Sequence, residues 1–165
     1  MIKKFSIFVE RNSTKILATI ATLLIWLMCY CCSAQTTDST MNKFIGHWVG
    51  KPYRLGGVTE RGIDCSQFNK RLYKEVFEIR LGNNCQAQWI QTDRVDRDSL
   101  ELGDLVFFKS RISPSGWHCG TYIGNNQIVH AANRAEGVKI SNLDEPRYKK
   151  GYKGAGRIKR KYITI

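Results

Sequence analysis

Histidine is scarce in this sequence: among 165 residues there are three, His47, His118 and His130. The chain has no internal repeat and no low-complexity linker, which excludes a repeat protein and predicts one domain of common size after the amino-terminal segment. None of the usual nucleic-acid-binding motifs occurs, so no nucleic acid partner is expected. Beyond residue 34 there is no Cys-x-x-Cys pair, which disfavours a structural zinc site.

Acidic residues are outnumbered, and the formal net charge is +12. The basic residues crowd toward the carboxyl terminus, where the segment 147–161 contains no acid. Such an excess favours polyanionic partners, such as an anionic lipid surface or an anionic cell-wall polymer. The apolar fraction, 42%, is typical of a globular rather than a disordered chain.

The first 34 residues have the pattern of an export signal. Basic residues at positions 3, 4, 11 and 15 precede an apolar run over residues 16–32, and Ser33 and Ala34 follow it. This pattern describes a secretory signal peptide and predicts cleavage after Ala34. Two alternatives stay open: an uncleaved membrane anchor, because about 17 apolar residues are just enough to span a bilayer, and lipidation at Cys29, Cys31 or Cys32.

All three interpretations place the remaining domain, residues 35–165 with a core at about 40–163, outside a bacterial cytoplasm. It is expected in the periplasm, at the outer membrane if the leader is lipidated, or secreted. Membrane anchoring would then depend on the leader alone.

Hydrophobic periodicity predicts helices first and an antiparallel sheet after them, an α+β fold class. Helices are expected at residues 40–49, 65–81 and 85–92, and a charged loop at 93–99. The uninterrupted apolar run 105–108 predicts a strand covered on both faces. Further strands are expected at 117–123, 127–132, 137–141 and 156–163.

Cys65 is the candidate nucleophile because it lies where a glycine-rich loop runs into the second helix. Asp64 or Ser66 is available to cap that helix. Unpaired backbone N–H groups and the positive end of the helix dipole favour a thiolate there, and such positions lower a cysteine pKa from about 8.5 to roughly 3.5–7.5. Three cysteines follow the leader, an odd number that leaves at least one thiol free. A disulfide between Cys85 and Cys119 is less favoured than two buried free thiols.

The candidate base and its partner, His118 and His130, both fall in a predicted hairpin around Gly124-Asn125-Asn126. Side chains alternate along a strand, so the loop length decides whether the two histidines share a face. A two-residue loop would place them on opposite faces, whereas a three-residue loop sets His130 opposite Gly120, on the face of His118. The three-residue loop, with Gly or Asn in left-handed conformation, is predicted.

Given that loop, His118 would take the proton of Cys65 and later protonate a leaving amine, while His130 would orient the ring of His118. The alternative is a buried cysteine with two unrelated histidines. Zinc is a weaker alternative, because His118 and Cys119 are adjacent and point to opposite faces of a strand. His47 has no predicted partner and is expected at the surface or at the rim of the core.

These residues lie in motifs that resemble the NlpC family of bacterial cell-wall cysteine endopeptidases. The resemblance spans about residues 40–165 and covers the following stretches: Pro52-Tyr53-Arg54-Leu55-Gly56-Gly57, Ile63-Asp64-Cys65-Ser66, Gly103-Asp104-Leu105-Val106-Phe107-Phe108, His118-Cys119-Gly120-Thr121-Tyr122-Ile123-Gly124 and Ile128-Val129-His130-Ala131.

The resemblance implies a papain-like α+β fold and a triad of Cys65, His118 and His130. It implies hydrolysis of an amide in the stem peptide of peptidoglycan, typically between γ-D-glutamate and a diamino acid, by a monomer without cofactor or metal. Tyr53 is expected beside the thiol, and Asp64 and Ser66 are expected to bind the stem peptide.

Three departures from the family pattern bear on substrate preference. Gln67 replaces a small glycine and is expected to narrow the cleft, Cys119 replaces an aliphatic residue, and the segment 81–91 lacks the usual Pro-Arg-Thr-Thr-like stretch. The alternatives to a wall endopeptidase are a thiol amidase or acyltransferase of the same superfamily and a non-catalytic wall-binding module.

Overall fold

The computed structural model describes residues 19–24, 26 and 37–163, and the chain divides into two compact units, Met1–Thr40 and Met41–Ile165. In the first unit residues 19–24 and 26 are helical. The positions named for cleavage or lipidation, at residues 29–34, lie outside the described residues. Among the described residues, no helix combines the length and the apolar character needed to cross a membrane.

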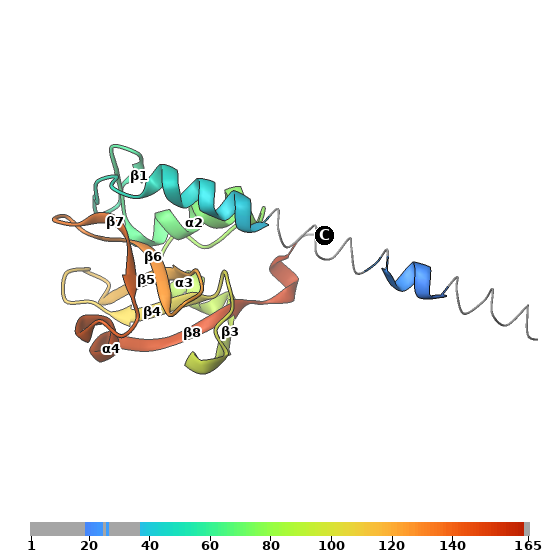
Figure 1. Ribbon diagram of the computed structural model, residues 1–165. Coiled ribbons are helices and arrows are strands. Elements are labelled where there is room, and N and C mark those ends of the chain that lie inside the picture. Colours follow the sequence, from blue (N-terminus) through green and yellow to red (C-terminus); the bar gives the residue numbers. More distant parts are fainter. Residues whose placement is uncertain (1–18, 25, 27–36, 164–165) are drawn as a thin grey trace, which may run out of the picture. The chain divides into compact units, whose positions relative to one another are not determined.

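The second unit is built around a six-stranded sheet in which every neighbouring pair of strands is antiparallel (Figure 1). Across the sheet the strands are β3 (Thr92–Val95), β8 (Tyr152–Ile158), β4 (Leu105–Lys109), β5 (Trp117–Tyr122), β6 (Gln127–Asn133) and β7 (Gly137–Asn142). A separate ribbon of two short strands, β1 (Val58–Thr59) and β2 (Gly62–Ile63), precedes them in the chain.

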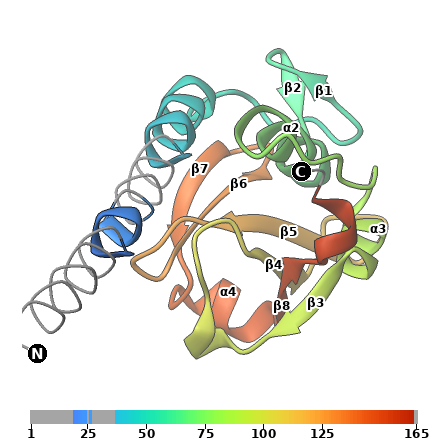
Figure 2. The same ribbon diagram turned by 90° about the vertical axis from the view of Figure 1, so that its right-hand side faces the viewer.

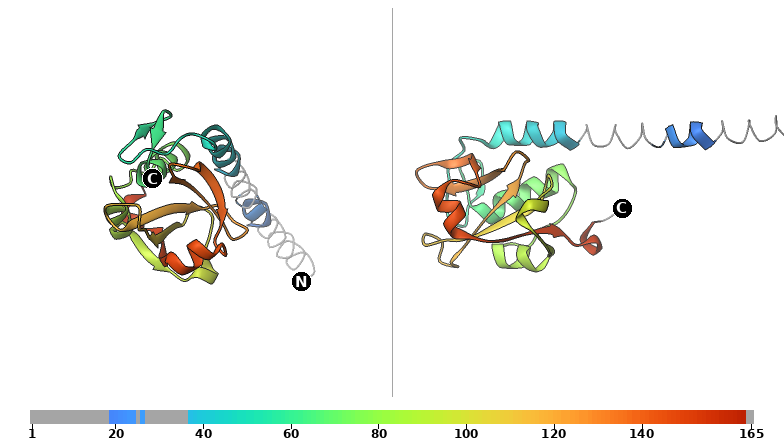
Figure 3. Two further views of the ribbon diagram at one scale, coloured as in Figure 1. Left: turned by 90° about the vertical axis from the view of Figure 1, so that its left-hand side faces the viewer. Right: turned by 60° about the horizontal axis from the view of Figure 1, so that its bottom comes forward.

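Helices cover both faces of this sheet. Helix α2 (Cys65–Val76) and helix α3 (Cys85–Ile90) pack against β5 on one face, whereas α4 (Pro146–Gly151) lies on the other (Figures 2 and 3). Residues 37–48 also form a helix, which begins three residues before the expected start at residue 40. Two short 3-10 turns are present as well, η1 (Arg97–Ser99) and η2 (Arg160–Tyr162). Because helices precede an antiparallel sheet, the expected α+β class is confirmed.

Strand β4 lies at the centre of the core. Leu105 and Phe107 point into the larger hydrophobic cluster beneath α2, and Val106 and Phe108 point into the smaller one beside α4. None of the four side chains is more than 2% exposed. The prediction that this apolar run forms a strand covered on both faces is therefore confirmed.

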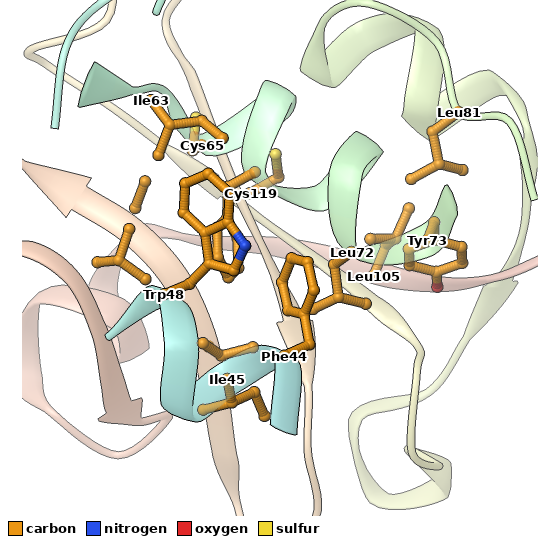
Figure 4. Packing of buried hydrophobic residues seen from close by; sticks show 14 of the residues in the cluster. Phe44, Ile45, Trp48, Ile63, Cys65, Leu72, Tyr73, Leu81, Leu105 and Cys119 are labelled. Carbon is orange, nitrogen blue, oxygen red and sulfur yellow. The ribbon is translucent and has the colours of Figure 1, made fainter. Parts of the chain in front are cut away.

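The larger cluster joins α2 to the helical residues 41–48 through aromatic side chains. The ring of Phe68, which is fully buried, lies 5.6 Å from that of Phe44 and 6.1 Å from that of Trp48 between centroids. Figure 4 shows Trp48 pointing toward Cys65 and Cys119. The helix expected at residues 40–49 is thus present, although Val49 is exposed rather than inward.

Several boundaries were predicted wrongly. Helix α2 ends at Val76 instead of residue 81, because Glu78 takes a left-handed conformation (φ 59°) and the N–H of Ile79 turns back to the carbonyl of Tyr73. Ile79 is still buried, which is why the apolar pattern continued past the helix. The charged segment 93–99 contains most of β3, an edge strand with exposed polar side chains. Its partner β8 spans Tyr152–Ile158 rather than residues 156–163, because a 3-10 turn at Arg160–Tyr162 follows it. Helix α3 ends at Ile90 rather than at residue 92, because Thr92 already begins β3.

A buried polar network crosses the interface between α2, α3 and β5. The hydroxyl of Thr121 donates to Oδ1 of Asn69 at 3.1 Å, and the amide of Asn69 donates to Oε1 of Gln88 at 3.4 Å. The amide of Gln88 in turn donates to the carbonyl of Ser66 at 2.8 Å. The side chains of Thr121, Asn69 and Gln88 are fully buried, so water cannot replace these hydrogen bonds. The network holds the first turn of α2 against the sheet.

Replacing Thr121 with valine is expected to lower the free energy of unfolding by about 1–3 kcal/mol, because the oxygen of Asn69 is left buried without a donor. Urea unfolding measures the loss. The matched control is Thr59→Val in the exposed strand β1, expected to change stability by less than about 0.5 kcal/mol. Equal stability of the two variants would show that the network does not contribute to the fold.

Candidate active site

Cys65 is the first residue of α2, and the preceding Asp64 caps the helix. Oδ1 of Asp64 accepts hydrogen bonds from the backbone N–H of Gln67 and from the hydroxyl of Ser66, both at 2.8 Å. Its Oδ2 accepts from the N–H of Gly56 at 3.0 Å. One carboxylate therefore joins the glycine-rich loop to the start of the helix and fixes the backbone on both sides of the thiol.

The hairpin between β5 and β6 has the three-residue loop that the sequence predicts. Tyr122 pairs with Ile128, and the N–H of Ile123 donates to the carbonyl of Gln127 at 3.0 Å. The loop residues all have positive φ: 88° for Gly124, 49° for Asn125 and 57° for Asn126. The prediction is confirmed, and its consequence follows: a Cβ added to Gly120 would lie 3.0 Å from Cβ of His130, so the two residues face each other.

The two histidines of this hairpin are in contact. Nε2 of His118 lies 2.7 Å from Nδ1 of His130. Nε2 of His130 lies 3.1 Å from the hydroxyl of Ser141 in β7 and 3.2 Å from that of Tyr148 in α4. When His118 donates to His130, its Nδ1 is left unprotonated and available to a thiol. The hydroxyl groups behind His130 complete the chain of hydrogen bonds.

The pKa of Cys65 lies well below the ordinary thiol value. The thiols of Cys119 and Cys85 hydrogen-bond to its sulfur and lower the pKa, burial opposes them, and the charge and hydrogen bond of His118 lower it further. Burial, followed by contact with the Cys65 sulfur, raises the pKa of Cys119. The hydrogen bond with Cys119 lowers the pKa of Cys85, but contact with Cys65 and burial outweigh it, so the pKa of Cys85 is raised overall. Of the three thiols, Cys65 is therefore the one whose pKa its surroundings lower.

Burial also lowers the pKa of His130, which is 0% exposed, and the charges of His118, Arg147 and Lys139 act in the same direction against that of Cys65. The folded protein thus keeps His130 neutral below pH 6.5, where the unfolded chain takes up a proton. Stability from this histidine is present above about pH 6.5 and is lost as the pH falls toward the folded pKa, by up to about 1.4 kcal/mol per pH unit.

Urea unfolding between pH 7.5 and pH 5 is expected to show this loss in the wild type and a flatter dependence in His130→Gln. The control is His47→Gln, whose side chain is exposed, and which should keep the wild-type slope. An unchanged slope in His130→Gln would assign the pH dependence to other groups.

The model of the NlpC/P60 family matches residues 50–157. The chain belongs to the NlpC/P60 family. It is 46% identical over 111 residues to murein DD-endopeptidase MepS/murein LD-carboxypeptidase of Escherichia coli K12, covering 67% of this chain and 57% of that protein. It is 38% identical over 123 residues to the probable endopeptidase NlpC of the same strain, covering 74% and 79%. The chain thus spans little more than half the length of MepS.

Solved structures agree with this assignment. An NlpC/P60 family protein from Bacillus cereus ATCC 10987 superposes with a TM-score of 0.66 at 28% identity, over 77% of this chain and 40% of that one. The NlpC/p60 domain of the peptidoglycan hydrolase SagA gives 0.61 at 24% identity, over 73% and 98%, and supports the fold alone. The resemblance seen in the sequence is confirmed, and the expected class, a hydrolase of the cysteine-peptidase type, agrees with the family.

In this NlpC/P60 domain the thiol opens into a cleft of about 290 Å³. Tyr53 lies in its wall, and burial, with the nearby Cys65, raises the pKa of Tyr53 to about 12. The expected substrate contacts Asp64 and Ser66 line the same cleft, although both are mostly buried. The remaining lining residues are Leu55, Gly56, Asn83, Asn84, Cys85, Ser113, Pro114 and Ser115.

Gln67, expected to narrow the cleft, is not among its lining residues. Its amide donates to the carbonyl of Asn83 at 2.8 Å, so it ties the 83–84 wall of the cleft to α2. His47, expected without a partner, lies 2.9 Å from Glu60 at the surface, away from the hairpin histidines. Both residues act on the loops around the site rather than on the thiol.

The sequence did not single out Ser141 and Tyr148 as partners of His130, nor Cys85 and Cys119 as neighbours of the thiol. His130 in β6 pairs with Lys139 in β7, and Ser141 lies two residues farther along β7 on the same face. The contact between Ser141 and His130 therefore follows only from the register of the two strands. The cysteines come from α3 and β5, at separations of 20 and 54 residues from Cys65. No local pattern in the chain indicates these contacts.

Proposed function

We propose that this domain is an exported cysteine endopeptidase that hydrolyses an amide in the peptide part of peptidoglycan, with Cys65 as nucleophile, His118 as base and His130 as the residue that orients His118. The observation that supports it most directly is the 2.7 Å contact between the two histidines, on the hairpin face that serves the helix-start thiol. Membership of the NlpC/P60 family supports the same chemistry.

In the proposed reaction the Cys65 thiolate attacks the carbonyl carbon of the amide. The backbone N–H of Cys65, at the start of α2, faces no intrahelical acceptor and can stabilise the oxyanion. The imidazolium of His118 gives its proton to the leaving amine, and a thioester to Cys65 remains. His118 then takes a proton from water, whose oxygen attacks the thioester, and the carboxylic acid product leaves with the thiolate restored.

The substrate class is the stem peptide, and two bonds are the candidates. The family resemblance favours the bond between γ-D-glutamate and a diamino acid, whereas the name of the 46% identical relative, a DD-endopeptidase, favours a bond between two D-centres in a cross-link. The net charge of +12 suits an anionic wall in either case. Tyr53, Asp64 and Ser66 are the proposed contacts to the peptide.

We place this activity outside the cytoplasm, with residues 1–34 as the leader and 35–165 as the catalytic domain of a monomer. The basic, apolar and small-residue segments of the leader support export. Cleavage, lipid attachment and an uncleaved anchor remain the three routes to the final location, and the last two would attach the enzyme to a membrane.

Digestion of purified sacculi, with products identified by mass spectrometry, tests the proposal. The wild type should release muropeptides that Cys65→Ala does not, and the new amino terminus identifies the bond. A stem that ends in D-glutamate, together with a fragment that begins with the free amine of the diamino acid, indicates the stem bond. Monomers released from cross-linked dimers indicate the DD bond. Unchanged sacculi would refute wall hydrolysis and leave the amidase, acyltransferase or wall-binding alternatives.

A further inference from the structure

Three cysteines from three different elements meet beneath the cleft. Cys65 begins α2, Cys85 begins α3, and Cys119 lies in β5. The sulfur of Cys85 lies 3.8 Å from that of Cys65 and 3.2 Å from that of Cys119, and all three sulfurs lie within 4.8 Å of one another. All are free thiols, and their exposed fractions are 6%, 4% and 0% in chain order.

These separations match the size of a metal–thiolate centre. A point equidistant from three sulfurs so placed lies about 2 Å from each, close to the zinc–thiolate bond of about 2.3 Å. Thiolates are soft ligands that select Zn²⁺ and Cu⁺ over Mg²⁺ or Ca²⁺. Cys65 and Cys85 line the cleft, so an ion can enter from solvent and keep its remaining coordination position toward the cleft.

We propose that Cys65, Cys85 and Cys119 form a trithiolate site for a thiophilic cation such as Zn²⁺. The ion binds the three sulfurs as thiolates, and their protons leave to solvent. Binding occupies the sulfur of Cys65, so a bound ion blocks the nucleophile, and a chelator restores it. The second consequence rests on the proposed function, but the binding itself does not.

A simpler arrangement has to be distinguished from this site. Cys65 and His118 are the usual pair of a cysteine hydrolase, and an ion held by these two alone would need neither Cys85 nor Cys119. The trithiolate site instead requires both of these cysteines. His118 is not among the residues whose ligand atoms lie within 4.8 Å of one another, so the site does not require it. Metal binding by variants of Cys85, Cys119 and His118 therefore distinguishes the two arrangements.

The test is the binding of Zn²⁺ to the reduced, metal-free protein, measured by competition with a chromophoric chelator, with Co²⁺ as a spectroscopic probe. The wild type should bind one ion, and Co²⁺ should give the intense charge-transfer absorption of several thiolates. Cys85→Ala and Cys119→Ala should each weaken Zn²⁺ binding at least about tenfold, and His118→Ala should change it by less than about threefold. Thermal unfolding verifies that each variant is folded.

A wild type that binds no Zn²⁺ overturns the proposal, as does undiminished binding in Cys85→Ala and Cys119→Ala with loss in His118→Ala. Should either cysteine variant fail to fold, the Co²⁺ spectrum of the wild type decides: the charge-transfer absorption of three thiolates is required, and the absorption of a single thiolate contradicts the site. Because no substrate is present, these results stand apart from wall hydrolysis. With active protein, saturating Zn²⁺ that leaves muropeptide release unchanged contradicts the blocking role.

Discussion

Replacing Cys65 with alanine is expected to lower kcat/KM for a soluble muropeptide at least about a thousandfold, because the reaction loses its covalent step and no other thiolate can replace it. Cys85 lies 3.8 Å away, but its pKa is raised overall, so it remains a thiol at neutral pH. Product formation is followed by chromatography and mass spectrometry, in a buffer with reductant and chelator.

The matched control is His47→Ala, which removes a surface side chain bound only to Glu60 and should change kcat/KM by less than about twofold. The free energy of unfolding of Cys65→Ala should fall little, since the variant also removes a buried thiolate whose desolvation is unfavourable. A variant that keeps a tenth of the wild-type activity would show that Cys65 is not the nucleophile.

The parts of the site that neighbours in sequence determine could be predicted before the structure. Asp64 and Cys65 are adjacent, and the capping geometry follows from the residue type and the apolar pattern behind it. The pairing of His118 with His130 depends on one variable, the loop length, and the positive φ angles of Gly124, Asn125 and Asn126 decide that variable in favour of three residues. Local chemistry was sufficient for both.

The contacts that depend on register between distant segments could not be predicted. Ser141 reaches His130 only because β7 pairs with β6 in one register, and Cys119 reaches Cys85 only because α3 packs on β5. The two patterns that disfavour zinc in the sequence, adjacent His118 and Cys119 on opposite strand faces and the lack of a Cys-x-x-Cys pair after the leader, concern only neighbours along the chain. The three sulfurs come together through tertiary packing, for which their spacing in the sequence gives no signal.

The limits of the elements show a related effect. Ile79 and Leu81 are buried, so the apolar period continued and predicted a longer helix, whereas the left-handed Glu78 ended α2 at Val76. Strand β3 was predicted as a loop because an edge strand exposes charged side chains to water, and these resemble a loop in the sequence. Burial pattern and backbone conformation are different properties, and the sequence reports the first more directly than the second.

Replacing His118 with alanine is expected to lower kcat/KM about a hundredfold to ten-thousandfold, and replacing His130 with alanine about tenfold to a hundredfold. In the proposed mechanism His118, which influences the pKa of Cys65, transfers the proton, whereas His130 contacts His118 and would act through it. The two variants are compared by full rate profiles over pH, with the muropeptide assay used for Cys65.

The pH profile separates positioning from mere support of the fold. His130→Gln keeps a side-chain amide that can accept from Nε2 of His118, so it should recover part of the rate lost in His130→Ala and restore the wild-type acidic limb. Ser141→Ala and Thr121→Val are the controls, the first for the hydroxyl behind His130 and the second for a buried hydroxyl without contact to either histidine. If His130→Ala loses stability but keeps the wild-type profile, His130 supports the sheet and the catalytic pair is Cys65 with His118 alone. If all three buried-site variants shift the profile alike, the shift reports loosened packing, and the orienting role of His130 is wrong.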